Sequence, residues 1–358
     1  MSTADSAIIN RILTSAIERR ASDVHLTAGN QPMLRYDGKL EPMADEAVVA
    51  PPFLQELIAF FLTEHAQAVL EARHYVVVGY SLGGKARFRV HASYQKGYPS
   101  FDLRYIPLQV ATPAILGLPK RLVELMGARE GLVLITGPLG SGRTTTLSSL
   151  VDSINHSTAR HVVMLAEPIE YVLGNDKSLI EQRTMGDDVS SIGEALDDVR
   201  NEDVDVLAVD VLLPSSAWPQ LVTLATSGTL VLVVMEADST VRALEYLTTP
   251  WPNLSPESMR LRLSEGLLGV SCQRLIPRLG GGRVLACEIL LGTQPVRSLI
   301  HEGRVHQVQT IVETSREEGM VPLEYQLATL VKNGDVLREE ALLQAVHRET
   351  LESLLKPK

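Results

Sequence analysis

A glycine-rich stretch between an apolar run and the start of a helical pattern restricts the fold of this chain more than any other feature. Residues 132–136 form the apolar run, and residues 137–144 follow as Gly-Pro-Leu-Gly-Ser-Gly-Arg-Thr. A glycine-rich turn that enters a helix directs several backbone N–H groups and the positive end of the helix dipole at one point. The stretch therefore predicts a strand, loop and helix that together can hold a polyphosphate.

One residue of this loop departs from the usual pattern. A phosphate loop normally carries a lysine and then a hydroxyl that holds Mg²⁺, whereas this chain has Arg143 and Thr144. Arginine keeps the charge but is bulkier, and it does not replace lysine at a tight phosphate site. We therefore expect a nucleotide and Mg²⁺ to bind weakly, with Thr144 as the metal ligand, and we favour this over a turn that only packs a helix on its strand. The expected nucleotide-binding positions are Gly137, Gly140, Ser141, Gly142, Arg143, Thr144 and Thr145.

Length and composition set broader limits. A chain of 358 residues suits two domains, and prolines and glycines at residues 107–119 predict a linker between domains at 1–106 and 120–358. A net charge of -10 disfavours a nucleic-acid binder. Two cysteines supply neither a disulfide framework nor a four-cysteine zinc site. No apolar run reaches the ~20 residues that span a bilayer, so we expect a cytoplasmic protein that does not insert into the membrane and associates with it only through partners.

Hydrophobic periodicity assigns the two domains to different architectures. In the first, residues 7–20 predict an amphipathic helix, residues 33–38 a hairpin with an Asp-Gly turn, and residues 87–91 a half-exposed strand. In the second, short apolar runs between helical stretches predict a mainly parallel sheet with covered faces. Its strands are expected at residues 132–136, 161–165, 204–209 and 229–235. Ser255 is the expected N-cap of a further helix, and the remainder of the chain is interpreted as helical.

Further stretches together resemble the PilT-like retraction ATPases of the type IV pilus, a branch of the type II/IV secretion ATPase superfamily. These stretches lie at residues 21–26, 32–38, 87–90, 103–107, 273–278, 281–284, 288–290 and 295–300. The resemblance covers nearly the whole chain. It implies an α/β protein with an N-terminal PAS-like α+β domain, then a RecA-like P-loop NTPase domain with a helical C-terminal portion, assembled as a hexamer. It also implies ATP and Mg²⁺ as the cofactors. Assembly-type relatives usually carry a four-cysteine metal module that this chain cannot supply, which favours the retraction branch.

Departures from the family pattern fall on the positions that carry its chemistry. The leading glutamate of the acidic box is replaced by Ala166, and the glycine-glutamate pair of Walker B by Asp210 and Val211. Valine can neither orient water nor help to hold Mg²⁺. Glu236 replaces the histidine of the histidine box, and the arginine-rich helix before Walker B has become acidic at residues 196–201. Asp210 can replace the missing base only if the strand ends there, because successive strand residues point to opposite faces.

Some groups that the family uses are retained. The candidate catalytic carboxylates are Glu167, Glu170 and Asp210. Arg87, Arg89 and Arg104 match positions from which the N-terminal domain of the family presents arginines toward nucleotide. An exposed strand face explains the same alternation, so both interpretations of these arginines stay open.

Two further groups complete the interpretation of the sequence. Residues 295–300 resemble the segment tied to retraction in the family, and we expect a helix there that packs through Val296, Leu299 and Ile300. Its Arg297 is expected to point to a neighbouring subunit or partner. The histidines at positions 25 and 161 are expected to be structural, and no group of histidines and cysteines has the spacing of a metal centre.

The sequence therefore favours a degenerate motor subunit over two alternatives. A positioned base typically supplies ~10²–10⁴-fold in rate and an arginine finger ~10³–10⁵-fold, so loss of such groups predicts slow hydrolysis. We expect an accessory or regulatory pilus ring protein, a homo- or hetero-hexamer with a PilT-like paralogue, which contacts the inner-membrane platform protein of the pilus. The alternatives are an active motor in which Arg143, Asp210 and Glu170 take over the missing tasks, and a structural ring component that ignores nucleotide.

Overall fold

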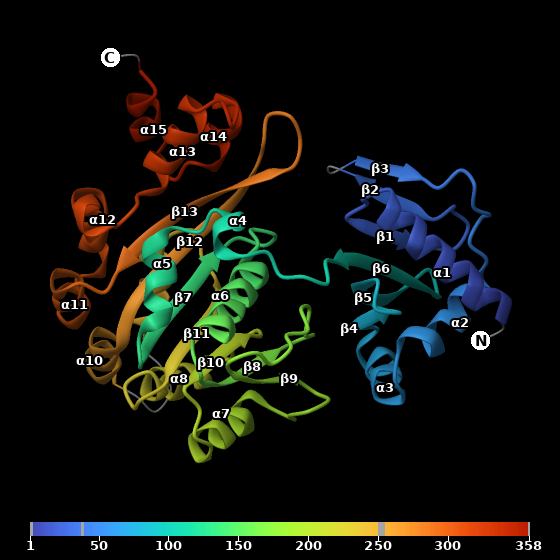
Figure 1. The fold of residues 1–358 in the computed structure, drawn as a ribbon, viewed down its shortest axis with the longest axis horizontal. Helices are drawn as coiled ribbons and strands as arrows, with labels where there is room; N and C mark the ends of the chain where they lie inside the picture. Colours follow the sequence, from blue (N-terminus) through green and yellow to red (C-terminus); the bar gives the residue numbers. More distant parts are fainter. Residues whose placement is uncertain (1–2, 37–38, 250–254, 357–358) are drawn as a thin grey trace. The chain divides into compact units, whose positions relative to one another are not determined.

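The computed structural model describes residues 3–36, 39–249 and 255–356, and the chain forms two compact units, each built around its own sheet (Figure 1). The first unit comprises Met1–Gln109 and the short segment Ala166–Val172, and the second comprises the rest of the chain. The α/β fold class predicted from the sequence, an α+β N-terminal part followed by a mainly parallel sheet with helices, is confirmed.

The first unit is an antiparallel sheet with helices on one face. The strands lie in the order β3-β2-β1-β6-β5-β4. The elements are α1 (Thr3–Glu18), β1 (Asp23–Leu26), β2 (Met33–Tyr36), β3 (Lys39–Pro42), α2 (Pro51–Phe61), α3 (Glu64–Arg73), β4 (Tyr75–Leu82), β5 (Ala86–Gln95) and β6 (Tyr98–Ile106). Apolar side chains of α1 and α2, such as Ile12 and Leu57, form one buried cluster with strand residues such as Phe88 and Val90.

The local predictions for this unit agree with the elements found. The helix expected at residues 7–20 is α1. Tyr36 of β2 pairs with Lys39 of β3, and the Asp-Gly turn predicted between these strands lies outside the described residues. In β5, buried and half-buried residues alternate, as the pattern at residues 87–91 predicts. This alternation places the arginines of β5 on the face of the sheet opposite the apolar cluster.

The second unit contains a sheet of order β13-β12-β7-β11-β10-β8-β9. Its strands are β7 (Gly131–Gly137), β8 (His161–Ala166), β9 (Leu179–Thr184), β10 (Val206–Asp210), β11 (Leu230–Glu236), β12 (Leu267–Pro277) and β13 (Arg283–Leu291). The α-helices are α4 (Pro113–Leu116), α5 (Lys120–Glu124), α6 (Arg143–Ser157), α7 (Ile192–Asn201), α8 (Trp218–Leu224), α9 (Thr240–Leu247), α10 (Pro256–Gly266), α11 (Gln294–His301), α12 (Val308–Thr314), α13 (Leu323–Lys332), α14 (Arg338–Gln344) and α15 (Arg348–Leu354). Strands β10, β11, β7 and β12 pair in parallel, and β13 pairs antiparallel with β12.

All four strands predicted from apolar runs are present, as β7, β8, β10 and β11. The interpretation of the chain beyond Ser255 as wholly helical is wrong, because residues 267–291 form β12 and β13 (Figure 1). These strands contain buried polar side chains, among them Gln273 and Glu288, whose hydrogen-bond partners lie far away in the sequence. Their polar residues therefore do not mark a solvent face, and the period of two that identifies a half-buried strand is lost.

Several helices begin at a side-chain cap. The hydroxyl oxygens of Ser191, Ser239 and Ser255 accept backbone N–H groups in the first turns of α7, α9 and α10, which satisfies donors that a helix start leaves unpaired. The N-cap predicted at Ser255 is thus confirmed. Across the described ranges, none of the helices has both the length and the apolar character that crossing a membrane requires.

Candidate phosphate-binding site

The glycine-rich loop joins β7 directly to α6. Strand β7 ends at Gly137, and Gly142, with φ at 88°, is the N-cap of α6. Gly140 also has a positive φ, 78°, and the backbone N–H of Ser141 donates to the carbonyl of Pro138 at 3.2 Å. The first N–H groups of a helix have no partner within the helix. The backbone therefore forms a compact turn whose donors can bind an anion.

The strand next to β7 in the sheet, β12, supports this loop. Gln273 of β12 is fully buried, and its side-chain amide donates to the carbonyl of Ser141 at 2.8 Å. A Cβ on Gly137 would lie 2.5 Å from both the carbonyl oxygen of Gln273 and the Oγ of Ser141. Only glycine fits at this position. Within the described residues, the buried Oγ of Ser141 has no hydrogen-bond partner, so the loop holds an unsatisfied polar atom.

The side chains at the start of α6 remain available to a ligand. Arg143 and Thr144 are partly exposed, and neither makes a hydrogen bond or ion pair with the residues that the structure describes. Thr145 does have a partner within the chain. A positive charge at the mouth of the loop and a hydroxyl beside it are the kinds of group that bind a polyphosphate and its Mg²⁺, although lysine is the usual source of the charge. The loop therefore fits both, with Arg143 in the position of the usual lysine.

Asp210 is the last residue of β10. Because the strand ends here, the Asp210 side chain is not bound by the alternation of side chains along a strand. This is the condition under which its carboxylate could replace the missing base. Asp210 is half-buried and interacts with other groups of the chain, so it is not free. Val211, at the family's glutamate position, packs against the main hydrophobic cluster of the second unit. An apolar, packed side chain therefore stands where the resemblance implies a carboxylate.

Glu236 lies beside the start of the loop. In the parallel pairing of β11 with β7, its Cα partner is Gly137, and its side chain is exposed. The backbone after it is held by Arg274 of β12, whose guanidinium donates to the carbonyl of Asp238 at 2.6 Å. A carboxylate at this edge raises the electrostatic cost of a phosphate next to it, whereas a histidine could donate a hydrogen bond.

The retained arginines of the N-terminal sheet all have partners within the first unit. Arg87 donates to the carbonyl of Ile169 at 3.1 and 2.8 Å, and burial lowers its pKa. Arg89 forms a 3.3 Å ion pair with Glu170, and Arg104 a 3.0 Å ion pair with Asp23 (these distances join side-chain nitrogen and oxygen atoms). The first two contacts tie β5 to the acidic segment Ala166–Val172.

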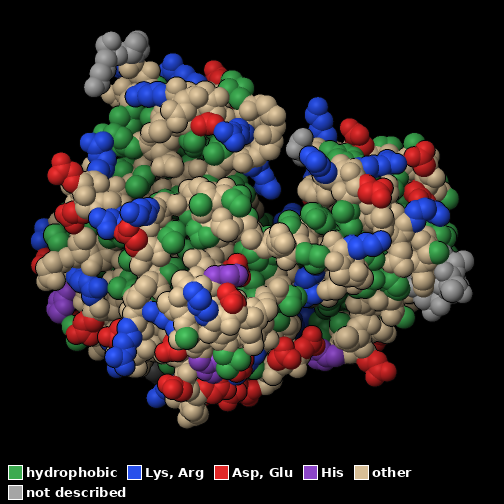
Figure 2. Space-filling view, in the orientation of Figure 1, with side chains coloured by type: hydrophobic (Ala, Val, Ile, Leu, Met, Phe, Trp, Pro, Cys, Tyr) green, Lys and Arg blue, Asp and Glu red, His purple; other side chains and the backbone are tan. Residues whose placement is uncertain are grey.

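The candidate carboxylates are not all brought together. Glu167 is exposed, whereas the side chain of Glu170 is only 15% exposed and is held by Arg89. Both belong to the first unit, while Asp210 and the glycine-rich loop belong to the second. The acidic helix predicted before Walker B is α7, and Figure 2 shows acidic side chains gathered over it at the lower edge of the view. Its exposed carboxylates are those of Glu194, Asp197 and Asp198.

Arg297 differs from its prediction. Val296 and Ile300 are buried and Leu299 packs on the core, as expected. However, the guanidinium of Arg297 does not point away from the chain. It donates to the backbone carbonyls of Ser264, Glu265, Leu267 and Gly292. These include the last carbonyls of α10, which have no partner within that helix, so Arg297 is a cap that local sequence could not reveal.

Sequence reasoning also missed Gln273 as a residue of the site. In the sequence, Gln273 stands out only as part of residues 273–278, a stretch that resembles the family. The one available signal was a pair of polar residues, Gln273 and Arg274, inside an otherwise apolar run. Once the run is identified as a buried strand, polar residues within it need specific partners, and both of these contact the region around the loop.

Comparison with known proteins places these features in context. The family profile for type II/IV secretion system proteins matches residues 118–281. The chain is 33% identical over 338 residues to the type IV pilus retraction ATPase PilT of Pseudomonas aeruginosa, covering 93% of this chain and 96% of that protein. It is 29% identical to a twitching motility protein of Neisseria gonorrhoeae, over 96% of this chain and 92% of that protein. The crystal structure of the pilus retraction motor PilT with bound ADP matches with a TM-score of 0.86 at 33% identity, covering 96% of this chain and 99% of that chain.

Proposed function

Because this chain belongs to the type II/IV secretion system protein family, among the PilT-like ATPases, we propose that it is a nucleotide-binding pilus motor subunit that hydrolyses ATP slowly. The observation that carries the proposal is a contrast between the phosphate loop and three positions to which the resemblance assigns catalytic groups. The backbone of the phosphate loop keeps its shape, while an alanine, a valine and a glutamate occupy positions 166, 211 and 236, where the family has catalytic groups.

Retention of nucleotide binding is supported by the loop itself. The positive φ angles of Gly140 and Gly142 and the lack of space for a Cβ on Gly137 match a backbone that wraps closely around phosphate. Arg143 has no competing partner within the described residues. Arginine keeps the positive charge but cannot reproduce the compact ammonium of lysine, so binding is weakened and not lost.

Slow hydrolysis is supported by the groups around the loop. Without a carboxylate at position 211, no side chain there orients the attacking water, and removal of such a base costs about 10²–10⁴-fold in rate. Glu236 adds a negative charge where charge develops on the transferred phosphoryl group. The chain then serves as an accessory or regulatory subunit, in a homo- or hetero-hexamer with a PilT-like paralogue, at the inner-membrane platform of the type IV pilus.

Two measurements on the purified chain test the proposal. Binding of a fluorescent ADP analogue with Mg²⁺ is expected, together with phosphate release far below that of an active PilT protein measured in parallel. The variant that combines Arg143→Lys with Val211→Glu should bind more tightly and hydrolyse faster. A parent chain that releases phosphate as fast as the active protein would refute the loss of hydrolysis, and the absence of binding would refute the nucleotide role.

A second candidate function is an active motor that uses Asp210 as its base. It is favoured by one observation, the end of β10 at Asp210, which frees this residue from strict strand alternation. Under this alternative, Asp210→Asn abolishes measurable hydrolysis in the parent chain while nucleotide binding persists. If Asp210→Asn leaves a slow parental rate unchanged, the residual turnover does not depend on this carboxylate.

A further inference from the structure

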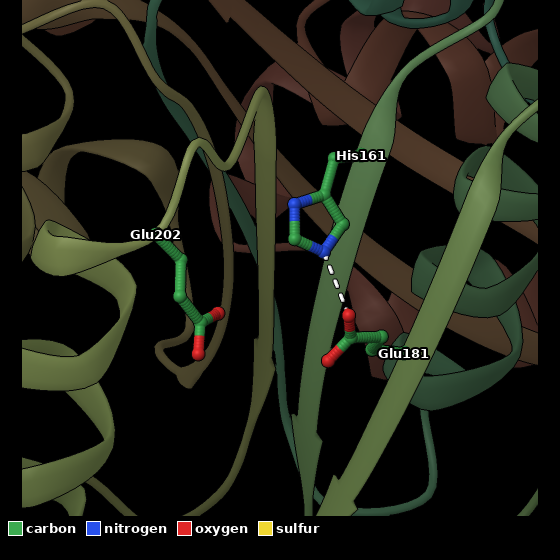
Figure 3. A group of neighbouring side chains, drawn as sticks. All are labelled: His161, Glu181 and Glu202. Carbon is green, nitrogen blue, oxygen red and sulfur yellow. Dashed lines mark hydrogen bonds and ion pairs between the residues drawn. The ribbon is translucent and has the colours of Figure 1, made fainter.

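Three side chains that are distant in the sequence meet at the start of β8. His161 begins β8, Glu181 lies in β9, and Glu202 follows α7 (Figure 3). The Nε2 atom of His161 lies 3.0 Å from the Oε1 atom of Glu181. One nitrogen or oxygen atom from each of the three residues can be chosen so that all lie within 4.8 Å of one another. This cluster belongs wholly to the second unit and has no part in the phosphate loop.

The imidazole of His161 has a hydrogen-bond acceptor at each ring nitrogen. Its Nδ1 atom lies 3.0 Å from the carbonyl oxygen of Asp203, and its Nε2 atom faces the carboxylate of Glu181. A neutral imidazole carries one N–H. With that proton on Nδ1, because a carbonyl oxygen can only accept, the lone pair of Nε2 points at a carboxylate. A lone pair and a carboxylate oxygen that face each other at this distance are an arrangement that a bound metal ion can bridge.

Arg183 holds the two carboxylates in place. Its guanidinium lies 2.8 Å from Oε2 of Glu181 and 2.9 Å from each carboxylate oxygen of Glu202. Each carboxylate has about four lone-pair sites, and Arg183 leaves the Oε1 atom of Glu181 facing His161. Carboxylates that bind metal are commonly supported by such hydrogen bonds from an outer residue.

We propose that His161, Glu181 and Glu202 form a binding site for a divalent transition-metal ion, Zn²⁺ by preference, with Arg183 as the supporting residue. Neutral imidazole and carboxylate oxygens are ligands that Zn²⁺ accepts, and a backbone carbonyl on the other ring nitrogen is the usual partner of a metal-bound histidine. Metal bonds of about 2.0–2.1 Å in tetrahedral geometry place neighbouring ligands roughly 3.3 Å apart. The 3.0 Å between His161 and Glu181 is close to this value, and a ligand atom of Glu202 lies within 4.8 Å of ligand atoms of both.

The position of the cluster indicates a structural role for the ion. The backbone carbonyl of His161 accepts a hydrogen bond from Asp205, immediately before β10, so the ion would join the beginning of β8 to β9 and to the end of α7. The glycine-rich loop instead follows the end of β7. The ion is therefore expected to stabilise the second unit and to leave nucleotide binding unchanged. Mg²⁺ prefers a shell of oxygen ligands and water, so the imidazole favours Zn²⁺ over the ion that accompanies nucleotide.

Titration calorimetry of Zn²⁺ into the full chain, without nucleotide and with Mg²⁺ in excess, tests this site. We expect micromolar or tighter binding, a rise in melting temperature with Zn²⁺, and about tenfold or greater weakening in His161→Gln and in Glu181→Gln. His65→Gln, at an exposed position of α3, is the matched control and should bind like the parent. Co²⁺ should give an absorption band that His161→Gln lacks.

The two variants distinguish the loss of a metal ligand from the loss of folding. Glu181→Gln keeps the shape of the side chain and an acceptor for Arg183, so it tests the charge even if His161→Gln unfolds. The proposal is overturned if the parent chain does not bind Zn²⁺ in excess Mg²⁺, or if Glu181→Gln binds it as tightly as the parent does. Either result is independent of whether the chain binds or hydrolyses ATP.

Discussion

The side-chain amide of Gln273 in β12 donates a 2.8 Å hydrogen bond to the backbone carbonyl of Ser141 in the phosphate loop. Both residues are buried, and the Cβ position of Gly137 lies against the same two residues. The conformation of the loop is therefore set by packing on β12 as well as by its own glycines.

Gln273→Leu should weaken both the fold and nucleotide binding. The substitution removes the hydrogen bond that the Gln273 amide donates to the Ser141 carbonyl, and a buried polar group that loses its partner costs about 1–3 kcal/mol. Chemical denaturation should show a decrease of that size in the free energy of unfolding, and titration with an ADP analogue should show weaker binding. Gln55→Leu, on the exposed side of α2, is the control. Equal nucleotide affinity in Gln273→Leu and the parent would contradict a role in shaping the loop.

Gly137→Ala and Gly140→Ala should differ in severity. Both glycines have a positive φ, but a Cβ on Gly140 meets no atom within 4 Å, whereas one on Gly137 lies 2.5 Å from two atoms. Gly140→Ala should cost only the backbone strain of about 1–2 kcal/mol, while Gly137→Ala adds overpacking of about 1–3 kcal/mol. Thermal and chemical unfolding of the two variants, measured side by side, check this order. A reversed order would show that the loop relaxes freely at Gly137.

Arg297→Ala should destabilise the second unit of the isolated chain, with no other protein present. It removes hydrogen bonds to four carbonyls at the end of α10 and before α11. A hydrogen bond that involves a charged group contributes about 1.5–3 kcal/mol to stability. We expect a decrease of at least about 1.5 kcal/mol in the free energy of unfolding. Arg297→Lys should recover only part of it, because one ammonium cannot reach the same set of carbonyls. Unchanged stability in Arg297→Ala would favour a surface role instead.

Glu288 should make the stability of the chain depend on pH. This residue of β13 is 4% exposed and accepts hydrogen bonds from the backbone N–H and hydroxyl of Thr240. Burial raises its pKa above the ordinary value of 4.5. The folded chain then retains a proton that the unfolded chain loses, so the contribution of Glu288 to stability falls as pH rises from 4.5 through the raised pKa, and is fully lost above it.

Glu288→Gln removes this titration and keeps an acceptor for Thr240. The free energy of unfolding of the variant, relative to the parent, should therefore increase with pH above 4.5, as measured by urea denaturation at a series of pH values. Glu318→Gln, at an exposed position, should show no such trend. A constant difference between Glu288→Gln and the parent across the series would rule out a raised pKa at Glu288.

The fold was largely predictable because its main signals are local. Apolar runs such as residues 132–136 are buried strands, and Ser255 caps a helix as its position before proline indicates. The strands β12 and β13 were missed for a physical reason: their polar residues, including Gln273 and Glu288, are satisfied by partners that only the tertiary structure brings near. Burial of paired polar groups breaks the rule that a polar residue marks a solvent face.

The candidate site was predictable in its loop and much less so in its surroundings. The glycines and Arg143 could be identified from spacing alone. The direction of Arg297 could not, because its acceptors on α10 and in the following strand are separated from it by about thirty residues. The grouping of His161 with Glu181 and Glu202 likewise depends on where β8, β9 and α7 end relative to one another. No spacing rule applies to ligands that separate elements provide.

The separation of 132 residues between Ser141 and Gln273 also affects how the chain is made. At a ribosomal rate of about 5–20 residues per second, Ser141 is synthesised roughly 7–26 s before Gln273, which supports the loop. During that interval a nascent chain contains every residue of the phosphate-binding motif but not its final shape. Nucleotide binding is therefore not expected to stabilise this unit in the earliest stage of its folding. A ribosome-stalled fragment that ends before β12 should not bind nucleotide.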